Sequence, residues 1–494
     1  MKRAVALSAA LCLSACAVGP DFEKPAPPAA KDYGAVPIAG KTAESNARSG
    51  QAQRFVAGMD IPAQWWTLFH SPKLSKLVDD AIKNNPDVAA AQAALRQSHE
   101  LYSAQWTSFF PVVQGNFNAT RTKIAQGTIT PITTSPNPTY NLYTAQLNVS
   151  YAPDIFGANI RATEAAKAQE NQSRYQLEAT YLTLASNVVV TAITEASLRD
   201  QIAATERLLV LQHQMTQIVR RQHAVGAAST LDVEAQEAAE AQTALILPTL
   251  EKQLGQTRDA LTALLGRLPS EEPAETFTLD DLVLPTDLPV SLPSKLVEQR
   301  PDVRQAEENL HAATAEVGVA VSAMLPQFEI DAGNGSNALL ASQLLSPGNG
   351  FWSLGGNVTQ TLFDMGELLH RRRAADAAMD QAAAQYKAAV ILACQNVADT
   401  LRALQADAKA VQAGDVAADS AHNAFLTAQR QLKLGSISHT ALINAEQTYQ
   451  QAEIALVQAR ANRFSDTAAL YQALGGGWWN RKEEADGQPG VAGE

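Results

Sequence analysis

The sequence predicts a membrane protein that is mainly α-helical with a small β part and is built from two structural repeats. The repeats show in the spacing of glycines: Gly157 and Gly226 are 69 positions apart, and so are Gly366 and Gly435. The stretch 158–225 contains neither glycine nor proline. A continuous helix of that length would be about 100 Å long, several times the length of an ordinary globular helix. Two such helices indicate a protein that spans a distance rather than one that encloses a reaction.

Each long helix is expected to be followed by a return helix. We place one helical hairpin at 158–265 with its tip near Gly226, and the other at 367–474 with its tip near Gly435. Pro248 predicts a kink in the first return helix, because proline removes one backbone hydrogen bond. Apolar residues recur at alternating spacings of three and four in both long helices, which is typical of helices that pack against neighbouring helices. These positions are Ala204, Leu208, Leu211, Met215 and Ile218 in the first helix, and Ala418, Ala421, Phe425, Ala428 and Leu432 in the second.

Four shorter segments alternate apolar with polar residues. They lie at about 112–121, 141–151, 327–334 and 351–362. Such alternation over about ten residues is typical of transmembrane β-strands. An amphipathic sheet that packs on a protein core is the alternative. The connections between paired segments are rich in Thr, Ser, Asn and Pro, which favours surface loops of a barrel.

Four strands are too few to close a membrane barrel, since the smallest barrels hold eight. An open sheet edge in lipid would leave backbone groups unpaired at a cost of several kcal/mol each. Several subunits must therefore share one barrel. Four strands from each copy give eight in a dimer and twelve in a trimer.

The N-terminus predicts an exported lipoprotein. Lys2 and Arg3 precede a short apolar stretch, so residues 1–15 are expected to be a signal peptide. Leu13-Ser14-Ala15-Cys16 resembles a bacterial lipobox, in which Cys16 becomes the first residue and carries covalent lipid. The alternative is an ordinary signal peptide with an incidental cysteine. Loss of the leader would change the net charge from −12 to −14.

The remaining organisation follows from composition. Residues 16–60 are expected to form a lipidated, extended tether. Repeat 1 covers 61–266, a Pro-rich equatorial linker covers 267–294, repeat 2 covers 295–475, and a polar tail covers 476–494.

Composition and motifs exclude several functions. The negative charge argues against a nucleic-acid partner. The sequence has no nucleotide-binding, serine-hydrolase or zinc-protease motif, so we expect no enzyme activity, no metal and no cofactor besides the lipid on Cys16. After export only Cys16 and Cys394 remain, and with Cys16 lipidated no intramolecular disulfide is expected.

Several motifs together resemble one family. The run Val18-Gly19-Pro20-Asp21-Phe22-Glu23-Lys24-Pro25, the pair Trp65-Trp66, the repeated Pro-Asp-Val at 86–88 and 301–303, and the ending Leu474-Gly475-Gly476-Gly477-Trp478 carry the resemblance. Together they resemble the TolC-like outer-membrane efflux proteins, in particular the lipoprotein branch that serves resistance-nodulation-division pumps (the NodT/OprM type). Phe22 stands where that branch commonly has tyrosine.

The resemblance implies a long α-helical barrel continued by an outer-membrane β-barrel, with four strands per subunit, closed by homotrimerisation. It implies a passive exit duct for drugs or other small solutes in the outer membrane of a Gram-negative bacterium, in contact with outer-membrane lipid. Its partners would be a periplasmic adaptor protein and an inner-membrane RND-type transporter. A type I-like export duct for proteins or peptides, and a non-conducting coiled-coil structural lipoprotein, are the alternatives.

The hairpin tips are the first candidate sites. They share Gly-x-x-Ser, in which glycine suits the left-handed residue that ends a helix and serine caps the next helix. The resemblance implies that these tips dock the adaptor; a purely structural turn is the alternative. The residues are Val225, Gly226 and Ser229 in the first tip, and Leu434, Gly435 and Ser438 in the second.

Channel gate candidates lie just inside the tips. Carboxylates repeated by symmetry would form rings that favour cations. The candidates are Asp232, Glu234, Asn444 and Glu446. The family's Leu-Asp-Ala-Gln stretch reads Ile443-Asn444-Ala445-Glu446 here, which puts an aspartate gate at that position in doubt. For Asp232 and Glu234, stabilisation of a helix N-terminus is an equal alternative. The basic run His370–Arg373 is expected to be a solvated or ion-paired face, with contact to lipid head groups as the alternative.

Overall fold

The computed structural model describes residues 17–30, 32–34, 39–123 and 139–481. The signal peptide, Cys16, most of the first loop and the end of the C-terminal tail lie outside these residues. The chain divides into two compact units. Unit 1 comprises residues 1–24, 95–173 and 306–386, and unit 2 comprises 25–94, 174–305 and 387–494.

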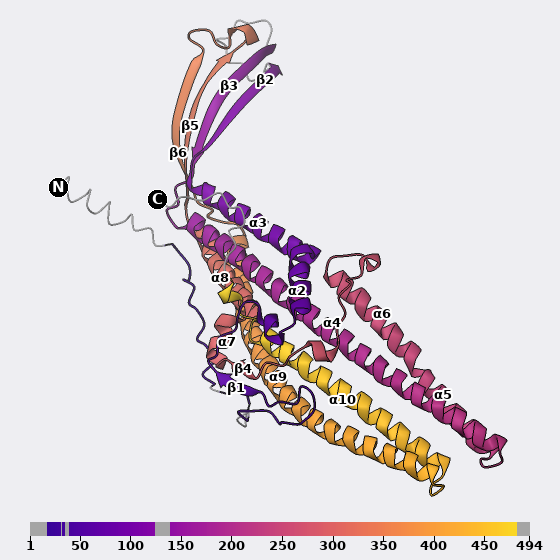
Figure 1. Ribbon diagram of the computed structural model, residues 1–494. Coiled ribbons are helices and arrows are strands. Elements are labelled where there is room, and N and C mark those ends of the chain that lie inside the picture. Colours follow the sequence, from indigo (N-terminus) through magenta and orange to yellow (C-terminus); the bar gives the residue numbers. More distant parts are fainter. Residues whose placement is uncertain (1–16, 31, 35–38, 124–138, 482–494) are drawn as a thin grey trace. The chain divides into compact units, whose positions relative to one another are not determined.

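Unit 1 contains one antiparallel sheet, with strand order β2-β3-β5-β6 (Figure 1). The strands are β2 (Val112–Lys123), β3 (Thr139–Tyr151), β5 (Gln327–Ala338) and β6 (Gly350–Thr359). Their register is continuous, so residues that pair across the sheet share a face. Within the described residues β2 and β6 each pair on one side only.

The two faces of this sheet differ in chemistry. One face carries large apolar side chains, and these are exposed: Phe117 by 67%, Leu147 by 58%, Trp352 by 78% and Leu354 by 71%. A sheet that packs on a core of the same chain would cover such side chains, so this alternative is wrong for the described chain. The other face is polar and carries Gln114, Asn116, Asn118, Gln146, Asn148, Ser150, Glu329, Asp331, Ser353 and Asn357.

Four helices contribute residues to both units. They are α3 (Pro86–Trp106), α4 (Ala158–Ala224), α8 (Pro301–Ser322) and α9 (Glu367–Lys433), and α4 and α9 have 67 residues each. Within unit 1, polar contacts define their lateral order. His99 of α3 lies 3.0 Å from Glu170 of α4. His311 of α8 lies 2.9 Å from Glu164 of α4, and Asn309 of α8 contacts Gln385 of α9 at 3.3 Å. The order is therefore α3-α4-α8-α9, with α3 and α9 at the two sides.

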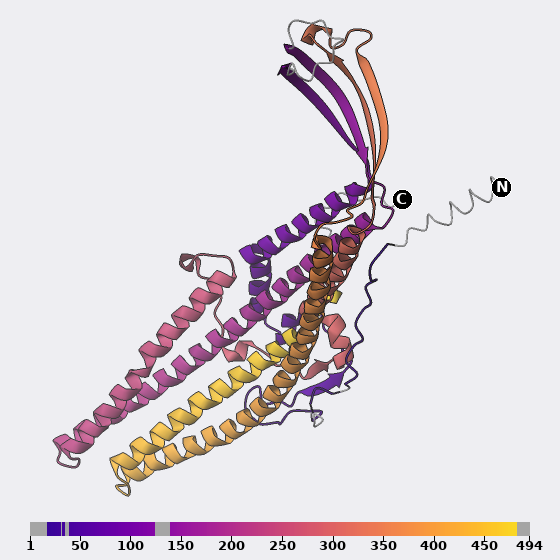
Figure 2. The same ribbon diagram turned by 180° about the vertical axis from the view of Figure 1, so that it is seen from behind.

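Unit 2 contains the two helical hairpins. In the first, α4 is followed by α5 (Thr230–Ala244) and α6 (Ile246–Leu264). In the second, α9 is followed by α10 (His439–Ala473), and Figures 1 and 2 both show the hairpins side by side. The predicted interruption at Pro248 occurs at Leu245, because the proline ring excludes a helical carbonyl four residues earlier, at Ala244. α10 has no such residue and is continuous.

The core of unit 2 is aromatic where the hairpins meet the remaining elements. Trp65 of η1 (Trp65–Phe69) stacks on Tyr471 of α10 with ring centroids 5.4 Å apart. Phe69 packs against Phe464 of α10. The smaller elements here are α2 (Pro72–Asn84) and α7 (Pro293–Gln299). One 18-residue window of α4 is apolar enough to cross a membrane by composition, but Val188, Val189 and Ile193 of α4 are fully buried in the protein.

Part of the predicted tether is folded. Residues Arg54–Ala57 form β1, which pairs in parallel with β4 (Asp287–Val290) from the Pro-rich linker. Gln53 is buried, and its amide nitrogen donates hydrogen bonds to Pro285 O and Thr467 Oγ1. The division of 16–60 and 267–294 into tether and linker is therefore too coarse, because β1 and Gln53 of the first segment bond the backbone of the second.

The start of the predicted polar tail is also folded. Gly476 and Gly477 have positive φ angles, and Trp478 Nε1 donates to Gln299 O at 2.7 Å. Asn480 Nδ2 donates to Asp60 Oδ2 at 2.8 Å. Residues 476–480 at the start of the predicted tail are therefore packed on unit 2, since glycine conformational freedom lets the chain turn back.

Candidate functional site

The first hairpin tip is a tight turn with a capped exit. Gly226 has φ +76°, the left-handed conformation that ends α4. Ser229 Oγ accepts a hydrogen bond from Asp232 N at 3.1 Å, and the Asp232 carboxylate accepts from Ser229 N at 2.9 Å. This reciprocal pair is a capping box at the start of α5.

The second tip repeats this geometry in a weaker form. Gly435 has φ +71°, and Ser438 Oγ accepts from Ala441 N at 3.3 Å. Ala441 occupies the position of Asp232, so the return hydrogen bond cannot form. The predicted roles of glycine and serine in the turns agree with these contacts.

Both tips expose apolar side chains. Val225 is 79% exposed, Leu231 74% and Leu434 83%. A Cβ atom added at Gly226 or Gly435 would meet nothing within 4 Å. Glycine is therefore required at these positions for its backbone angle and not for space, and the tip surfaces are open to a partner.

A small apolar cluster lies close behind the tips. Met215 of α4, Phe425 and Ala428 of α9 and Leu442 of α10 are buried together. Three of these four residues, Met215, Phe425 and Ala428, lie at the predicted seam positions. The cluster joins the first hairpin to the second, so the two tips belong to one packed end of unit 2.

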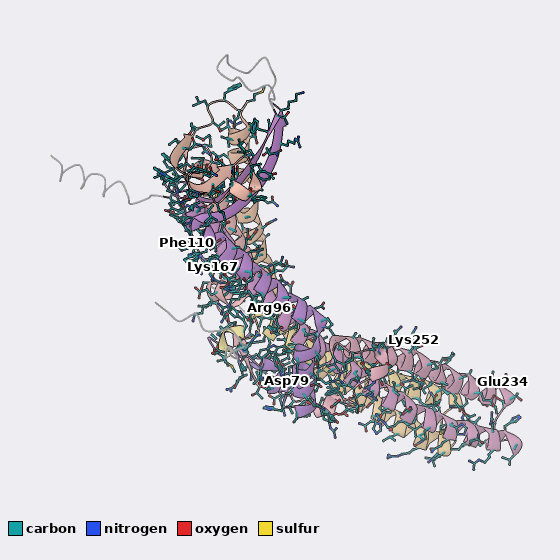
Figure 3. All side chains as sticks on the ribbon, turned by 90° about the horizontal axis from the view of Figure 1, so that it is seen from above. Asp79, Arg96, Phe110, Lys167, Glu234 and Lys252 are labelled. Atoms are coloured by element: carbon teal, nitrogen blue, oxygen red, sulfur yellow. The ribbon has the colours of Figure 1, made fainter. Side chains whose placement is uncertain are left out.

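The four gate candidates have different environments. Asp232 is held by Ser229, and these hydrogen bonds lower the pKa of its carboxyl. Glu234 is exposed near the turn end of its helix (Figure 3). Asn444 is exposed on α10. Within the described residues, no hydrogen bond or ion pair connects any two of the candidates.

Glu446 differs from the other candidates because it is completely buried. Neither of its carboxyl oxygens has a hydrogen-bond partner in the described chain, and burial raises its pKa to about 7. Its repeat equivalent, Glu237, lies at the surface and pairs with Arg220 at 2.9 Å. A carboxyl in this environment is neutral in acid and becomes a buried, unpaired charge at alkaline pH.

The structure adds a polar seam that the sequence analysis did not identify. Gln212 of α4, Gln236 of α5 and Gln450 of α10 are buried beside the same helices. Both side-chain polar atoms of Gln236 lack a partner in the described structure, and Thr243 Oγ1 reaches Gln450 Oε1 only at 3.5 Å. No residue pattern in the sequence marked these glutamines.

Some histidines lie beside one or two glutamates. His213 Nδ1 lies 2.9 Å from Glu240, and His311 lies 2.9 Å from Glu164 and 3.6 Å from Glu308. In the parts of the chain that the structure describes, no group of three or more potential metal ligands occurs.

The profile of the outer membrane efflux protein family matches residues 77–267 and 292–476. The chain is 28% identical over 422 residues to the pyoverdine export outer membrane protein OpmQ of Pseudomonas putida, covering 85% of this chain and 89% of the relative. It is 26% identical over 483 residues to the probable efflux pump outer membrane protein TtgC of Pseudomonas putida, covering 98% and 97%.

Solved structures agree with this match. The outer-membrane channel OprN superposes with a TM-score of 0.83 at 26% identity, over 94% of this chain and 100% of that chain. The Campylobacter jejuni CmeC outer membrane channel gives a TM-score of 0.83 at 22% identity, over 94% and 95%. These matches confirm the predicted location in the outer membrane and the predicted role as the channel subunit of an efflux system. The chain belongs to the outer membrane efflux protein family.

Proposed function

We propose that three copies of this chain form a passive exit duct across the outer membrane. The observation that carries this proposal is the four-stranded sheet, which has an exposed apolar face and two edge strands, β2 and β6, each paired on one side. In lipid, the edges require partners, which other copies can supply. Twelve strands suit a trimer, the assembly that the family resemblance implies.

The helices support the same assembly. The lateral order α3-α4-α8-α9 places α9 of one copy beside α3 of the next. Apolar residues on α3 and the turn after it are exposed in the single chain and would be covered by α9 of the neighbouring copy. They are Leu101 (60%), Trp106 (50%) and Phe110 (51%). These four helices from each copy, twelve in a trimer, would continue the duct beyond the strands.

The proposed cargo is a drug or another small solute. The relatives are described as exporting pyoverdine, antibiotics and toluene. The polar face of the sheet, mostly amides and hydroxyls, would line the pore and offer little resistance to varied solutes. An inner-membrane RND-type transporter would supply the energy, and a periplasmic adaptor would bind the open tips. A protein-export duct is less well supported, and a non-conducting spacer does not account for the exposed apolar strands.

Lipidation of Cys16 is part of this proposal. Ala17, the next residue, lies against Gly157, where an added Cβ would be 2.5 Å from Ala17 Cα. The following segment is fixed in unit 1. The rings of Phe22 and His311 stack with centroids 4.3 Å apart, and the Arg161 guanidinium donates a hydrogen bond to Asp21 Oδ1 at 2.6 Å. A lipid on Cys16 would therefore anchor the chain close to the end of the strands.

Conductance tests the proposal. Purified full-length protein should migrate as a trimer in native mass spectrometry from detergent and should produce discrete single-channel steps in planar bilayers. Monomers, or trimers that give no conductance under any applied voltage, would refute the duct.

A further inference from the structure

The connection from β6 to α9 exposes an unusual set of apolar side chains. Leu362 is 92% exposed, Phe363 84% and Met365 87%. The corresponding connection in repeat 1 is less exposed, and among the described residues 152–157 Ile155, at 44%, is its only exposed large apolar side chain. There, Phe156 packs near Phe328 with ring centroids 6.3 Å apart, and its carbonyl accepts from Val18 N at 3.1 Å. The two repeats therefore differ in what their connections contact.

The N-terminal segment indicates the level of the membrane surface. Val18 N donates a hydrogen bond to Phe156 O, and Val18 lies only two residues after Cys16. Consecutive Cα atoms are about 3.8 Å apart, so a lipid-bearing Cys16 must lie within roughly 8 Å of Val18. Acyl chains on Cys16 would enter the adjoining leaflet. Phe156 then marks the head-group level of that leaflet.

The strand register relates this head-group level to the connection between β6 and α9. Phe328, the ring neighbour of Phe156, is paired with Val358 of β6. Leu362 follows Val358 by four residues, which span at most about 14 Å. Val358 itself is 59% exposed on the apolar face. The exposed side chains of 362–365 thus continue the lipid-facing surface of the sheet down to the head-group level.

Polar groups beside this connection fit a phosphate-bearing surface. Asp364 fixes the start of α9 by accepting hydrogen bonds from Gly366 N at 2.9 Å and Leu368 N at 2.8 Å. Arg371 pairs with Glu367 and Arg372 with Asp376, whereas Arg373 is exposed and has no ion pair within the described chain. Helical side chains lean toward the helix N-terminus, which directs Arg373 toward the connection.

We propose that Leu362, Phe363 and Met365 form a membrane-contact patch that inserts into the phospholipid leaflet, with Arg373 binding a lipid phosphate. This inference rests on the proposed function, because the lipid on Cys16 sets the level of the leaflet. The patch gives repeat 2 a non-covalent membrane contact on its side of each subunit, matching the covalent anchor beside repeat 1.

Site-specific photo-crosslinking tests the patch. Phe363 is replaced by p-benzoylphenylalanine in the full-length lipidated protein, which is reconstituted in nanodiscs of phosphatidylethanolamine and phosphatidylglycerol. Irradiation should give a single-chain product that carries phospholipid mass. The matched control places the same group at Leu434, which is 83% exposed at the second tip and should give no lipid adduct. Arg373→Glu should lower the phosphatidylglycerol adduct at position 363 about fivefold.

The outcomes separate this inference from the proposed function. A product of two crosslinked chains without lipid would show that a neighbouring copy covers the patch and would overturn the inference. No adduct at all would also overturn it, because a side chain in lipid has acyl groups within reach. Channel conductance measured on the same preparation tests the duct independently, so loss of the adduct with intact conductance refutes only the patch.

Discussion

Arg463 Nε donates a hydrogen bond to Gln53 Oε1 at 3.1 Å, which joins α10 to a residue 410 positions earlier in the chain. The same guanidinium donates to the carbonyl oxygens of Ser49 and Gln51. Arg463 is only 1% exposed. One buried cation therefore holds a segment that sequence composition describes as a tether.

Arg463→Ala should release this segment. Loss of a buried charged donor leaves several acceptors unpaired, and we expect a loss of about 3 kcal/mol. Arg48 and Arg54 lie in the segment and are trypsin sites, so limited trypsin digestion should cleave there several times faster than in the parent. Arg402→Ala, whose side chain is 64% exposed, is the control and should not change the cleavage rate. Equal cleavage in both variants would contradict the role of Arg463.

Glu446→Gln should change how stability depends on pH. The pKa of Glu446 is raised from 4.5 to about 7 by burial. The folded protein therefore retains a proton that the unfolded chain releases, and stability falls as pH rises from about 4.5 to 7. The loss should be about 3 kcal/mol by pH 8 and absent below pH 4.5.

Thermal melting of the detergent-solubilised protein at pH 5 and pH 8 measures this effect. Glu446→Gln should narrow the difference between the two melting temperatures relative to the parent. Glu237→Gln, at the equivalent surface position in repeat 1, should leave the difference unchanged. If Glu446→Gln shows the same difference between its melting temperatures at pH 5 and pH 8 as the parent, the Glu446 carboxyl is solvated and the prediction is wrong.

Ser229→Ala should weaken the start of α5 by about 1 kcal/mol. Asp232→Ala removes the other half of the same capping box, so the two effects should not add in the double variant. Hydrogen exchange of the first turn of α5 measures the loss, and Ser438→Ala in the second tip should have the smaller effect. If Asp232→Ala changes ion selectivity and leaves hydrogen exchange unaltered, the gate interpretation of Asp232 is favoured over capping.

Gly226→Val and Gly435→Val should impair efflux while trimers persist. Valine is strained at positive φ and reshapes the tip, although no atom is close enough to clash. Susceptibility of a deletion strain complemented with each variant gives the readout, and native mass spectrometry reports assembly. Gly255→Ala, in open space on α6 and without a positive φ, should behave like the parent. Full efflux in both tip variants would argue against adaptor docking.

Cys16→Ser should abolish acylation. The thiol is the only group at this position that can form the thioether to diacylglycerol, so metabolic labelling with palmitate should disappear. Cys394→Ser is the matched control and should retain the label. Undiminished labelling of Cys16→Ser would refute the lipobox.

Sequence by itself determined the periodic features of this protein. Glycine spacing located both hairpins and their turns, because a residue in the left-handed conformation ends each of the two 67-residue helices. Alternation located the strand segments, since side chains of a strand point to opposite faces. Pro248 placed the break in the first return helix for a local steric reason.

Tertiary structure alone decided which polar residues are buried. Glu446 and Glu237 occupy equivalent positions, yet one is buried without a partner and the other pairs with Arg220 at the surface. Gln53 and Arg463 meet only because the chain folds back over 410 residues. Burial of this kind depends on contacts between distant segments, and no local pattern of residues encodes it.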